Sequence, residues 1–465
     1  MLERFDAIII GTGQAGKPLA GALAEAGWRT AIVEKDERVG GTCILTGCTP
    51  TKTMIASARV AHVARRAADY GVETGSVAIN LEVVRRRKRD IVESWSASSR
   101  RGMERHQTLE LLMGHARFTA PKVVTVEMHA GGTRTLTAGH IFINVGTRPA
   151  IPAIPGLAQA GALDNETVME LGEVPEHLVV LGGGFVGLEF GQMFHRFGSR
   201  VTVVESRSRF LPHEDEDIAE QVASLLREDG IDLYCGVKTE RVDRRADGMV
   251  AVTTTIGEAE RVLTGTHVLV ATGRVPNSDT LDPEKAGFDL DDRGYFRVND
   301  RLETNIPGVF VLGDANGGPP FTHVSYDDFR IIRTNVLGNG TATTRDRLLP
   351  YTAFIDPQLG RVGLTERQAR DAGYVVRIAT LPMSRVARAI EMDETRGVMK
   401  AVVDAATGRI LGAAILGVEG GEIAAVIQVA MMAGLPYTAL KEAVFAHPTL
   451  AESLNNLFME MDAAR

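Results

Sequence analysis

The chain has 465 residues, of which 44% are hydrophobic and 24% charged, with a net charge of −8. This length predicts more than one domain, because single cores rarely grow beyond about 250–300 residues. The negative charge excludes broad binding to nucleic acids or anionic membranes, and no apolar run reaches the roughly 18 residues of a membrane span. The opening MLERFDAIIIGTG is not typical of a secretory signal, so we expect a cytoplasmic protein.

The stretch FDAIIIGTGQAGKPLAGALAEAGWRTAIVEK predicts a strand, a glycine turn, a helix and a second strand. Gly11, Gly13 and Gly16 form G-x-G-x-x-G directly after the first strand, and Glu34 ends the second. Such glycines let the backbone approach a pyrophosphate at a helix N-terminus, and the acidic residue binds a ribose hydroxyl. The sequence therefore predicts a dinucleotide site here.

Two cysteines follow in GGTCILTGCTPTK, at positions 43 and 48. Pro50 suits the first turn of a helix, which places Cys48 at or just before a helix N-terminus, where a thiolate is stabilised. Five residues of ideal helix rise about 7.5 Å, more than disulfide Cα atoms usually span, so a bridge needs an irregular backbone between Cys43 and Cys48. Gly40, Gly41 and Gly47 permit that irregularity, and we interpret the pair as a reducible disulfide.

Other interpretations of the cysteines are two ordinary buried thiols or part of a zinc site. A structural zinc needs four ligands, and no further cysteine or close histidine is available, so we expect no metal site. Cys235, in GIDLYCGV, is expected to be a buried, inert thiol. The basic run RRRKRD at 85–90 is expected to be the solvated face of a helix rather than a nucleic-acid patch.

The dinucleotide pattern returns in HLVVLGGGFVGLEFGQMFHRFGSRVTVVES, with Gly182, Gly184 and Gly187 after a strand and Glu205 at the next strand end. The first glycine and the acidic residue are 23 positions apart in both copies. Two dinucleotides bound by one chain predict electron or hydride transfer between them.

The second copy also bears on the choice of coenzyme. Glu205 would repel a 2′-phosphate and favours NADH, whereas Arg207 and Arg209 would grip that phosphate. The sequence gives NADH a slight preference and leaves NADPH open.

The remaining sequence divides into recognisable segments. Apolar strands in 141–156 and 268–277 end in Gly-Thr-Arg-Pro and Gly-Arg-x-Pro turns and bracket the second copy, and VFVLGDANGG ends in Asp314, which would accept hydrogen bonds from a polyol. After about residue 346, strands in GVMKAVVDAATGRILGAAILG and later helices predict an α+β domain. We therefore expect an α/β protein with two Rossmann-like domains and a C-terminal α+β domain. The expected segments are 1–150, 151–276, 277–345 and 346–465.

These features resemble the pyridine nucleotide-disulfide oxidoreductases, a flavoprotein family that includes glutathione reductase, dihydrolipoamide dehydrogenase and mercuric reductase. The redox motif of that family, G-G-T-C-x-x-x-G-C-x-P-[ST]-K, is matched by GGTCILTGCTPTK, and the resemblance covers essentially the whole chain. It implies that segments 1–150 and 277–345 are two parts of an FAD-binding domain. It also implies that 151–276 binds NAD(P)H and that 346–465 is a dimerisation domain.

The resemblance also implies roles for single residues. Cys48 would lie nearest the flavin, Cys43 would face the substrate, and Lys52 would pair with Glu189 beside the flavin. Residues of the two glycine motifs would contact the cofactors together with Thr42, Gly273 and Asp314.

The C-terminal stretch VFAHPTLAESLNNLF resembles the His-Pro-Thr-x-x-Glu motif of the family. By that resemblance His447, oriented by Glu452, is the acid/base of the other subunit's active site, which implies a homodimer. A histidine is suited to moving a proton to or from a thiolate. A structural alternative is that Thr449 and Glu452 form a capping box for the last helix.

Within the family, GCTPTKT, FTHVSYDDFRI, ETRGVMKAVVD and the last stretch resemble the reactive-chlorine-resistance flavoprotein reductases. That resemblance implies electron flow from NAD(P)H through FAD and the Cys43–Cys48 disulfide to hypothiocyanous acid, copper(II) or mercury(II). A dihydrolipoyl dehydrogenase with Thr51 in place of serine, a mercuric-reductase-like enzyme, and a redox-sensing NAD(P)H-binding regulator remain alternatives. The chain lacks the cysteine pairs typical of mercuric reductases, which argues against mercury as the dedicated substrate. His323 is expected either near FAD or in the core.

Overall fold

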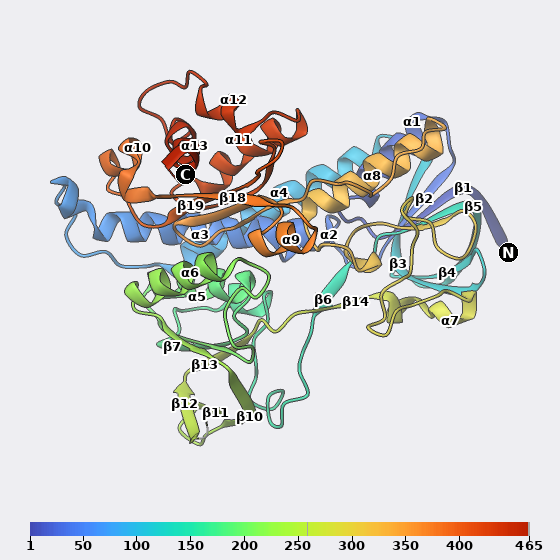
Figure 1. Ribbon diagram of the computed structural model, residues 1–465. Helices are drawn as coiled ribbons and strands as arrows, with labels where there is room; N and C mark the ends of the chain where they lie inside the picture. The colour runs from blue at the N-terminus through green and yellow to red at the C-terminus, as the bar shows by residue number, and fades with distance from the viewer. Residues whose placement is uncertain (258, 464–465) are drawn as a thin grey trace. The chain divides into compact units, whose positions relative to one another are not determined.

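The computed structural model describes residues 1–257 and 259–463 (Figure 1). The chain forms two compact units. The first unit comprises 1–54, 82–150 and 273–347. The second comprises 55–81, 151–272 and 348–465.

The first unit is built on a six-stranded sheet whose inner strands are parallel and apolar. Its strands, in sheet order, are β1 (Leu2–Ile10), β2 (Thr30–Glu34), β3 (Leu109–Ala120), β4 (Val123–Met128), β5 (Thr133–Ile143) and β15 (Val309–Val311). Strand β1 also pairs directly with β5. Ile8 and Ile9 are fully buried in two separate core clusters, as expected for a parallel strand that is covered on both faces.

Helices cover this sheet because their leucines and phenylalanines repeat at helical spacing. Leu19 and Leu23 of α1 (Gly16–Glu25) and Phe329 of α8 (Thr322–Leu337) share one core cluster with Ile9. The other helices of the first unit are α2 (Gly41–Leu45), α4 (Leu81–Glu104) and α7 (Pro283–Ala286), whereas α3 (Cys48–Arg65) begins in the first unit and ends in the second. Helix α4 contains the basic run at 85–90, which confirms the helix, although Lys88 is buried rather than solvated.

The second unit contains the second Rossmann-like fold. Its parallel sheet has the order β13 (His267–Val270), β7 (His177–Leu181), β8 (Arg200–Glu205), β9 (Asp232–Cys235). Helix α5 (Phe185–Phe197) packs on β7 and β8, and α6 (Glu216–Glu228) packs on β9. A three-stranded antiparallel sheet of β10 (Val237–Arg244), β11 (Val250–Ile256) and β12 (Ala259–Gly265) lies in the same region of the chain.

The segments predicted to be Gly-Thr-Arg-Pro and Gly-Arg-x-Pro turns contain short strands instead. The residues after each glycine form short strands, β6 (Thr147–Pro149) and β14 (Arg274–Pro276), which pair with each other antiparallel. Each proline lies at a strand end, which is compatible with its missing N–H. The two chain crossings are therefore joined by strand pairing, which sequence spacing alone did not reveal.

The C-terminal domain is an antiparallel sheet covered by helices. Strand order is β16 (Pro350–Ala353), β17 (Gln358–Gly363), β20 (Ile410–Gly417), β19 (Val398–Asp404), β18 (Val376–Pro382). The pairing of β19 with β20 confirms the two predicted strands around a turn. The helices are α9 (Glu366–Asp371), α10 (Ala387–Glu391), α11 (Gly420–Met432), α12 (Tyr437–Lys441) and α13 (Ser453–Ala463).

The expected fold class is thereby confirmed, while the four expected segment boundaries stay predictions. Within residues 1–257 and 259–463, we find no helix with the length and apolar character that a bilayer crossing requires.

The contact of β17 with α11 gives a test of the packing. A Cβ built on Gly360 would lie 2.4 Å from the carbonyl oxygen of Gly420, whereas one on Gly102 of α4 would meet nothing within 4 Å. We expect Gly360→Ala to lower the free energy of unfolding by about 1–3 kcal/mol, because the backbone of α11 must move. Gly102→Ala, the matched control, should be neutral or slightly stabilising. Chemical denaturation of both variants measures this, and equal stability would contradict the packing described.

Candidate active site

The first glycine loop joins β1 to α1 and admits no side chains. Gly11 has φ of +102°, and a Cβ there would lie 2.4 Å from the carbonyl oxygen of Asn144. A Cβ on Gly16 would lie 2.3 Å from the carbonyl oxygen of Gly11, and one on Gly13 would lie 2.7 Å from Oδ1 of Asn144. Helix α1 has no side-chain cap and no acidic residue in its first turn. This arrangement fits a pyrophosphate at the helix N-terminus.

Glu34, at the end of β2, holds this loop in shape. Its Oε2 accepts hydrogen bonds from the N–H of Thr12, at 3.0 Å, and from the Thr12 hydroxyl, and its Oε1 accepts one from Asp36 N–H at 3.0 Å. The carboxylate is buried at the strand end where a ribose would lie. The ribose contact itself stays a prediction.

Asn144 is a functional position that the sequence reasoning missed. Its Oδ1 accepts the N–H of Gly16 at 2.9 Å, and its Nδ2 donates to the carbonyl of Leu312 at 2.9 Å. The side chain therefore ties the glycine loop to the strand end before Asp314. The signal was an amide directly after the buried strand in IFINVG, because a buried amide needs hydrogen-bond partners.

Asp314 lies in a single turn, Gly313–Asn316, directly after β15. Gly313 has φ of +70°, which favours glycine. Oδ2 of Asp314 accepts a hydrogen bond from the Thr147 hydroxyl at 3.0 Å. Burial raises the pKa of Asp314, and Arg274 opposes that rise. A half-buried carboxylate on this turn is suited to accepting polyol hydroxyls, and that contact stays a prediction.

A buried ion pair supports the Asp314 turn, and it too was missed. Asp328 of α8 is 1% exposed and accepts the N–H of Gly313 at 2.8 Å. Arg347 donates to its other oxygen at 2.7 Å, and Asn316 Nδ2 lies 3.2 Å from the first. Burial raises the pKa of Asp328, and these hydrogen bonds oppose that rise. Asp328 belongs to FTHVSYDDFRI. In the sequence this stretch indicated a family resemblance, and it did not indicate that Asp328 holds the Asp314 turn.

The redox loop is packed directly on the first glycine loop. Gly40 N–H donates to the hydroxyl of Thr12 at 2.9 Å. Gly41 has φ of +63°, and a Cβ there would lie 2.7 Å from Cα of Gly13. Only glycine permits this approach, so GG in GGTC holds the cysteines beside the dinucleotide loop.

The backbone between the cysteines is irregular, as expected. Helix α2 ends at Leu45 and α3 begins at Cys48, which confirms the predicted helix start. A Cβ on Gly47 would lie 2.9 Å from the carbonyl oxygen of Thr42, so this glycine serves a close approach at the break. Thr42 is the exposed second residue of α2.

Cys43 and Cys48 both carry free thiols, and Cys48 lies close enough to act on the Cys43 thiol through a side-chain hydrogen bond. Cys43 is half-buried and Cys48 is exposed. The hydrogen bond with Cys48 and burial raise the pKa of Cys43, while Thr322 and the Lys17 ammonium pull it down. Because Cys43 holds its proton strongly in this arrangement, forming its thiolate calls for a base.

Thr322, the first residue of α8, was also missed by the sequence reasoning. Its Oγ1 lies 3.2 Å from Sγ of Cys48, within hydrogen-bond distance. The adjacent His323 is exposed and stacks on Phe321 with ring centroids 5.3 Å apart. The interpretation of His323 as a core residue is therefore wrong.

The second glycine loop resembles the first in its positive φ angle and its close backbone contacts. Gly182 has φ of +114°, and a Cβ there would lie 2.3 Å from the carbonyl oxygen of Ala271. A Cβ on Gly187 would lie 2.0 Å from the carbonyl oxygen of Gly182. Gly184 is the N-cap of α5, which has no side-chain cap, and a Cβ on Gly184 would meet nothing within 4 Å. The open side of Gly184 fits the approach of a pyrophosphate.

Glu205, at the end of β8, closes this loop as Glu34 closes the first. Its Oε2 accepts Gly183 N–H at 2.8 Å and its Oε1 accepts Arg207 N–H at 2.8 Å. Arg207 is exposed, whereas Arg209 donates to the carbonyl of Pro212 at 3.0 Å.

Cys235 lies opposite Glu205 in the neighbouring strand, β9. It is half-buried rather than buried, which corrects the expectation for this thiol. Burial raises the pKa of Cys235, so its thiol stays protonated and poorly nucleophilic. The expected inertness is therefore compatible with its surroundings.

Three further predicted residues are placed as follows. Lys52 is half-buried and is the fifth residue of α3. Glu189 of α5 is 3% exposed and accepts Phe354 N–H at 2.8 Å. Gly273 has φ of +135°, so the backbone there favours glycine. The pairing of Lys52 with Glu189 stays a prediction.

His447 and Glu452 are brought together before α13. Nδ1 of His447 lies 2.8 Å from Oε2 and 3.1 Å from Oε1 of Glu452. Thr449 Oγ1 accepts Glu452 N–H at 3.3 Å, so one half of the alternative capping box is also present. The carboxylate is directed at the imidazole, and this fixes the ring and its tautomer. The role in another subunit stays a prediction.

Comparison with known proteins identifies the family. Residues 5–328 match the family model described as pyridine nucleotide-disulphide oxidoreductase, and 349–458 match its dimerisation domain. The chain belongs to this family. It is therefore an FAD-containing redox enzyme that uses NAD(P)H, and the glycine loops described above fit both cofactors.

The relatives include several kinds of reductase from this family. The chain is 38% identical over 460 residues to a probable pyridine nucleotide-disulfide oxidoreductase, RclA, of Escherichia coli, covering 98% of this chain and 99% of the relative. It is 32% identical to a mercuric reductase of Staphylococcus aureus, covering 98% and 82% of the two chains. A solved copper(II) complex of the HOCl-induced flavoprotein disulfide reductase RclA of Escherichia coli superposes with a TM-score of 0.90 at 38% identity, covering 98% and 99% of the two chains.

The buried support of the Asp314 turn generates a prediction. We expect Asp328→Asn to weaken FAD binding at least about tenfold, because the buried carboxylate that holds the Asp314 turn loses its charge and its ion pair with Arg347. The matched control is Asp327→Asn, since Asp327 also bonds Arg347, at 3.1 Å, but is 35% exposed. Flavin absorbance per protein after dialysis, and titration with FAD, measure the effect. Equal flavin content in both variants would contradict the role assigned to Asp328.

Proposed function

We propose that this protein passes electrons from NAD(P)H through FAD and the Cys43–Cys48 pair to an electrophilic oxidant or metal ion. Hypothiocyanous acid, copper(II) and mercury(II) are the candidate acceptors, and the role is defence against oxidants. The observation that carries the proposal is the packing of Gly41 on Gly13, which holds two hydrogen-bonded thiols beside a dinucleotide loop.

The name and solved complexes of the E. coli relative favour an oxidant or copper(II) as the acceptor class over lipoamide. The location of Thr322 supports the same choice. This residue begins the α8 segment that resembles the reactive-chlorine-resistance reductases, and it lies against Cys48. The alternatives, a dihydrolipoyl dehydrogenase, a mercuric-reductase-like enzyme or a sensor without fast turnover, are separated from it by the acceptor measurement below.

With hypothiocyanous acid the steps balance as two thiol reactions. The Cys43 thiolate attacks the sulfur of the acid, an S–S bond forms, and the S–O bond breaks to release hydroxide, which is protonated to water. The Cys48 thiolate then attacks Cys43 Sγ, expels thiocyanate and forms the disulfide. FAD, when bound, accepts hydride from NAD(P)H and supplies the two electrons that reopen this disulfide.

The proton on Cys43 is moved by a histidine base. Cys43 holds its proton through its hydrogen bond with Cys48 and its burial, so a base must accept that proton before attack. His447 of the partner subunit is suited to this task, since Glu452 fixes the imidazole through Nδ1 and leaves Nε2 to face a donor. The proposal therefore includes a homodimer, with no role for nucleic acid or membrane.

NADH is the preferred coenzyme in this proposal. The Glu205 carboxylate lies at the strand end where the adenosine ribose binds in such folds, held there by two backbone N–H groups. A 2′-phosphate at that place would meet a negative charge. Arg207 is exposed nearby and is the residue that would favour NADPH.

Cysteine substitutions test the acceptor chemistry. We expect Cys43→Ser to lose at least about a hundredfold in kcat with hypothiocyanous acid while keeping its FAD, because the attacking sulfur is absent. Cys235→Ser is the control and should retain activity. Turnover of hypothiocyanous acid, lipoamide, mercury(II) and copper(II), followed by NADH absorbance, measures both. Full activity of Cys43→Ser would end the thiol mechanism, and fast turnover of lipoamide by the wild type would favour the dihydrolipoyl dehydrogenase alternative.

The coenzyme preference has its own test. We expect kcat/KM to be higher for NADH than for NADPH, and Glu205→Gln to shift the ratio toward NADPH by about tenfold, equivalent to about 1.4 kcal/mol. The amide keeps an acceptor for Gly183 N–H but removes the charge. Arg207→Met should shift the ratio in the opposite direction. An unchanged ratio in Glu205→Gln would show that the carboxylate does not select the coenzyme.

A further inference from the structure

The loop between β8 and α6, residues 206–215, packs against the second glycine loop at Gly183. The ring of Phe210 is 2% exposed, and a Cβ built on Gly183 would lie 2.2 Å from it. Leu211 N–H donates to the carbonyl of Gly183 at 3.3 Å, and Leu211 itself has φ of +46°. This backbone conformation is strained for leucine and persists only where neighbours enforce it. The position of the 206–215 loop therefore sets the position of the glycine loop.

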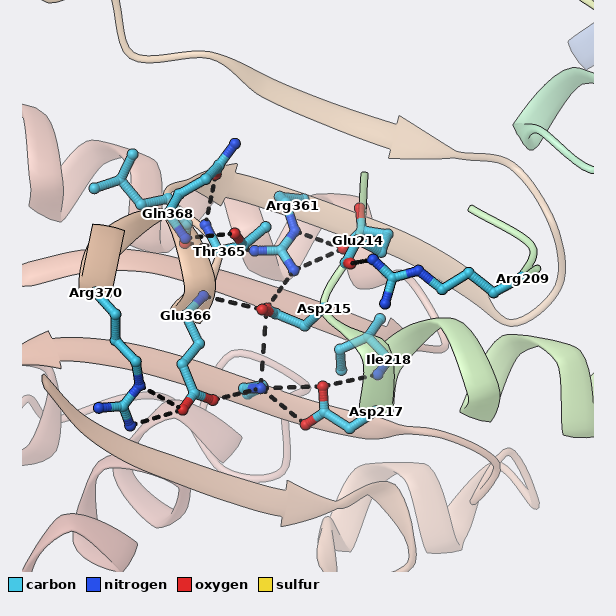
Figure 2. A network of polar contacts seen from close by, with 12 residues as sticks. Arg209, Glu214, Asp215, Asp217, Ile218, Arg361, Thr365, Glu366, Gln368 and Arg370 are labelled. Carbon is cyan, nitrogen blue, oxygen red and sulfur yellow. Dashed lines mark hydrogen bonds and ion pairs between the residues drawn. The ribbon is translucent and has the colours of Figure 1, made fainter. Parts of the chain in front are cut away.

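What fixes the 206–215 loop is an arginine of the C-terminal domain (Figure 2). Arg361 of β17 donates from Nε to Oε2 of Glu214 at 2.7 Å and from Nη2 to Oδ2 of Asp215 at 2.8 Å. Arg361 and Glu214 have side chains that are 3% exposed, and that of Asp215 is 5% exposed. One guanidinium therefore binds the last two residues of the loop at a buried site, with a two-pronged geometry that lysine does not reproduce.

Two more residues of the C-terminal domain, Glu366 and Lys400, contact Asp215 or the nearby Asp217. Glu366 N–H, at the start of α9, donates to Oδ1 of Asp215 at 3.0 Å. The Lys400 ammonium lies 3.0 Å from the carboxylate of Glu366 and 2.8 Å from that of Asp217. Asp215 is the N-cap residue of α6, yet its side chain makes no cap hydrogen bond to that helix. Its carboxylate serves the contact with β17 and α9 instead.

The energetics of buried ion pairs favour a positioning role for this contact. Desolvation cancels much of the attraction in such pairs, so apolar residues of similar volume often give equal stability. Burial raises the pKa of Glu214, and the Arg361 guanidinium opposes that rise. The contact thus contributes a fixed geometry for the loop more than it contributes stability.

We propose that Arg361 is a positioning residue for the nicotinamide coenzyme. By holding Glu214 and Asp215 it fixes the 206–215 loop, and through Phe210 and Leu211 it fixes the glycine loop that receives the pyrophosphate. This inference rests on the proposed function insofar as the second loop binds NAD(P)H. It assigns the C-terminal domain, through β17, a part in coenzyme affinity.

The test is anaerobic stopped-flow reduction of the flavin by NADH in the full-length, FAD-loaded protein, with no acceptor present. We expect Arg361→Met to raise the apparent Kd for NADH at least about fivefold and to leave the limiting rate of reduction within about twofold, since the reacting groups are untouched. Arg361→Lys should restore part of the affinity, because it keeps the charge but not the two-pronged geometry.

The matched control is Arg196→Met. Arg196 is equally buried, at 5%, and pairs with Asp356 of the same C-terminal domain, but it lies in the last turn of α5, away from the 206–215 loop. It should leave the Kd for NADH unchanged. Thermal unfolding of each variant separates loss of affinity from loss of structure, and Arg361→Lys or Glu214→Gln replaces Arg361→Met if that variant does not fold.

Two outcomes would overturn the inference while the proposed function stands. One is an unchanged Kd in folded Arg361 variants, and the other is an equal rise in Arg196→Met, which would indicate a general loosening of the domain. A wild-type flavin that neither NADH nor NADPH reduces would contradict the proposed function itself, and the inference with it.

Discussion

The rest of the candidate active site depends on one close approach of backbone to backbone, between Gly41 and Gly13. No side chain fits there, because a Cβ on Gly41 would lie 2.7 Å from Cα of Gly13. The hydroxyl of Thr12 links the two loops further, since it accepts Gly40 N–H and donates to Glu34. One set of contacts thus shapes the dinucleotide loop and presents the cysteines. The first glycine loop, which must be rigid to bind a pyrophosphate, therefore also supports the two cysteines.

The two dinucleotide loops share a sequence pattern but are held by different neighbours. In the first unit an amide, Asn144, bonds the glycine loop and the strand end before Asp314. In the second unit an aromatic ring, Phe210, fills the same supporting role beneath Gly183. The amide gives directional hydrogen bonds, whereas the ring depends on its own loop being fixed. In the proposal above, Arg361 of the C-terminal domain fixes that supporting loop by binding Glu214 and Asp215.

Much of this arrangement could be predicted because it depends on spacing along the chain. The glycine motifs, the strand-end acids and the helix start at Cys48 all follow from local rules of turns and helix N-termini, and each lies where the sequence placed it. The pairing of His447 with Glu452 was implied by the resemblance to a family motif rather than by local rules.

The supports could not be predicted, because they join residues far apart in the sequence. Asp328 reaches Gly313 across 15 positions, and Asn144 reaches Gly16 across 128. Arg361 meets Glu214 across 147. Nothing in the local sequence of a strand such as QLGRVG marks which carboxylate its arginine will bind. The β6–β14 pairing was missed for the same reason, since each short strand looks like a turn until its partner is known.

The central claim, that the cysteine pair carries electrons from the coenzyme, is tested most directly by counting thiols during reduction. The oxidised, FAD-loaded protein would be titrated anaerobically with NADH and quenched with a thiol reagent under denaturing conditions. The account predicts two equivalents of NADH per flavin for full reduction and a gain of two reactive thiols, both assigned to Cys43 and Cys48 by peptide mapping. Full reduction by one equivalent with no gain in thiols would contradict it, and would show that electrons leave the flavin without passing through the disulfide.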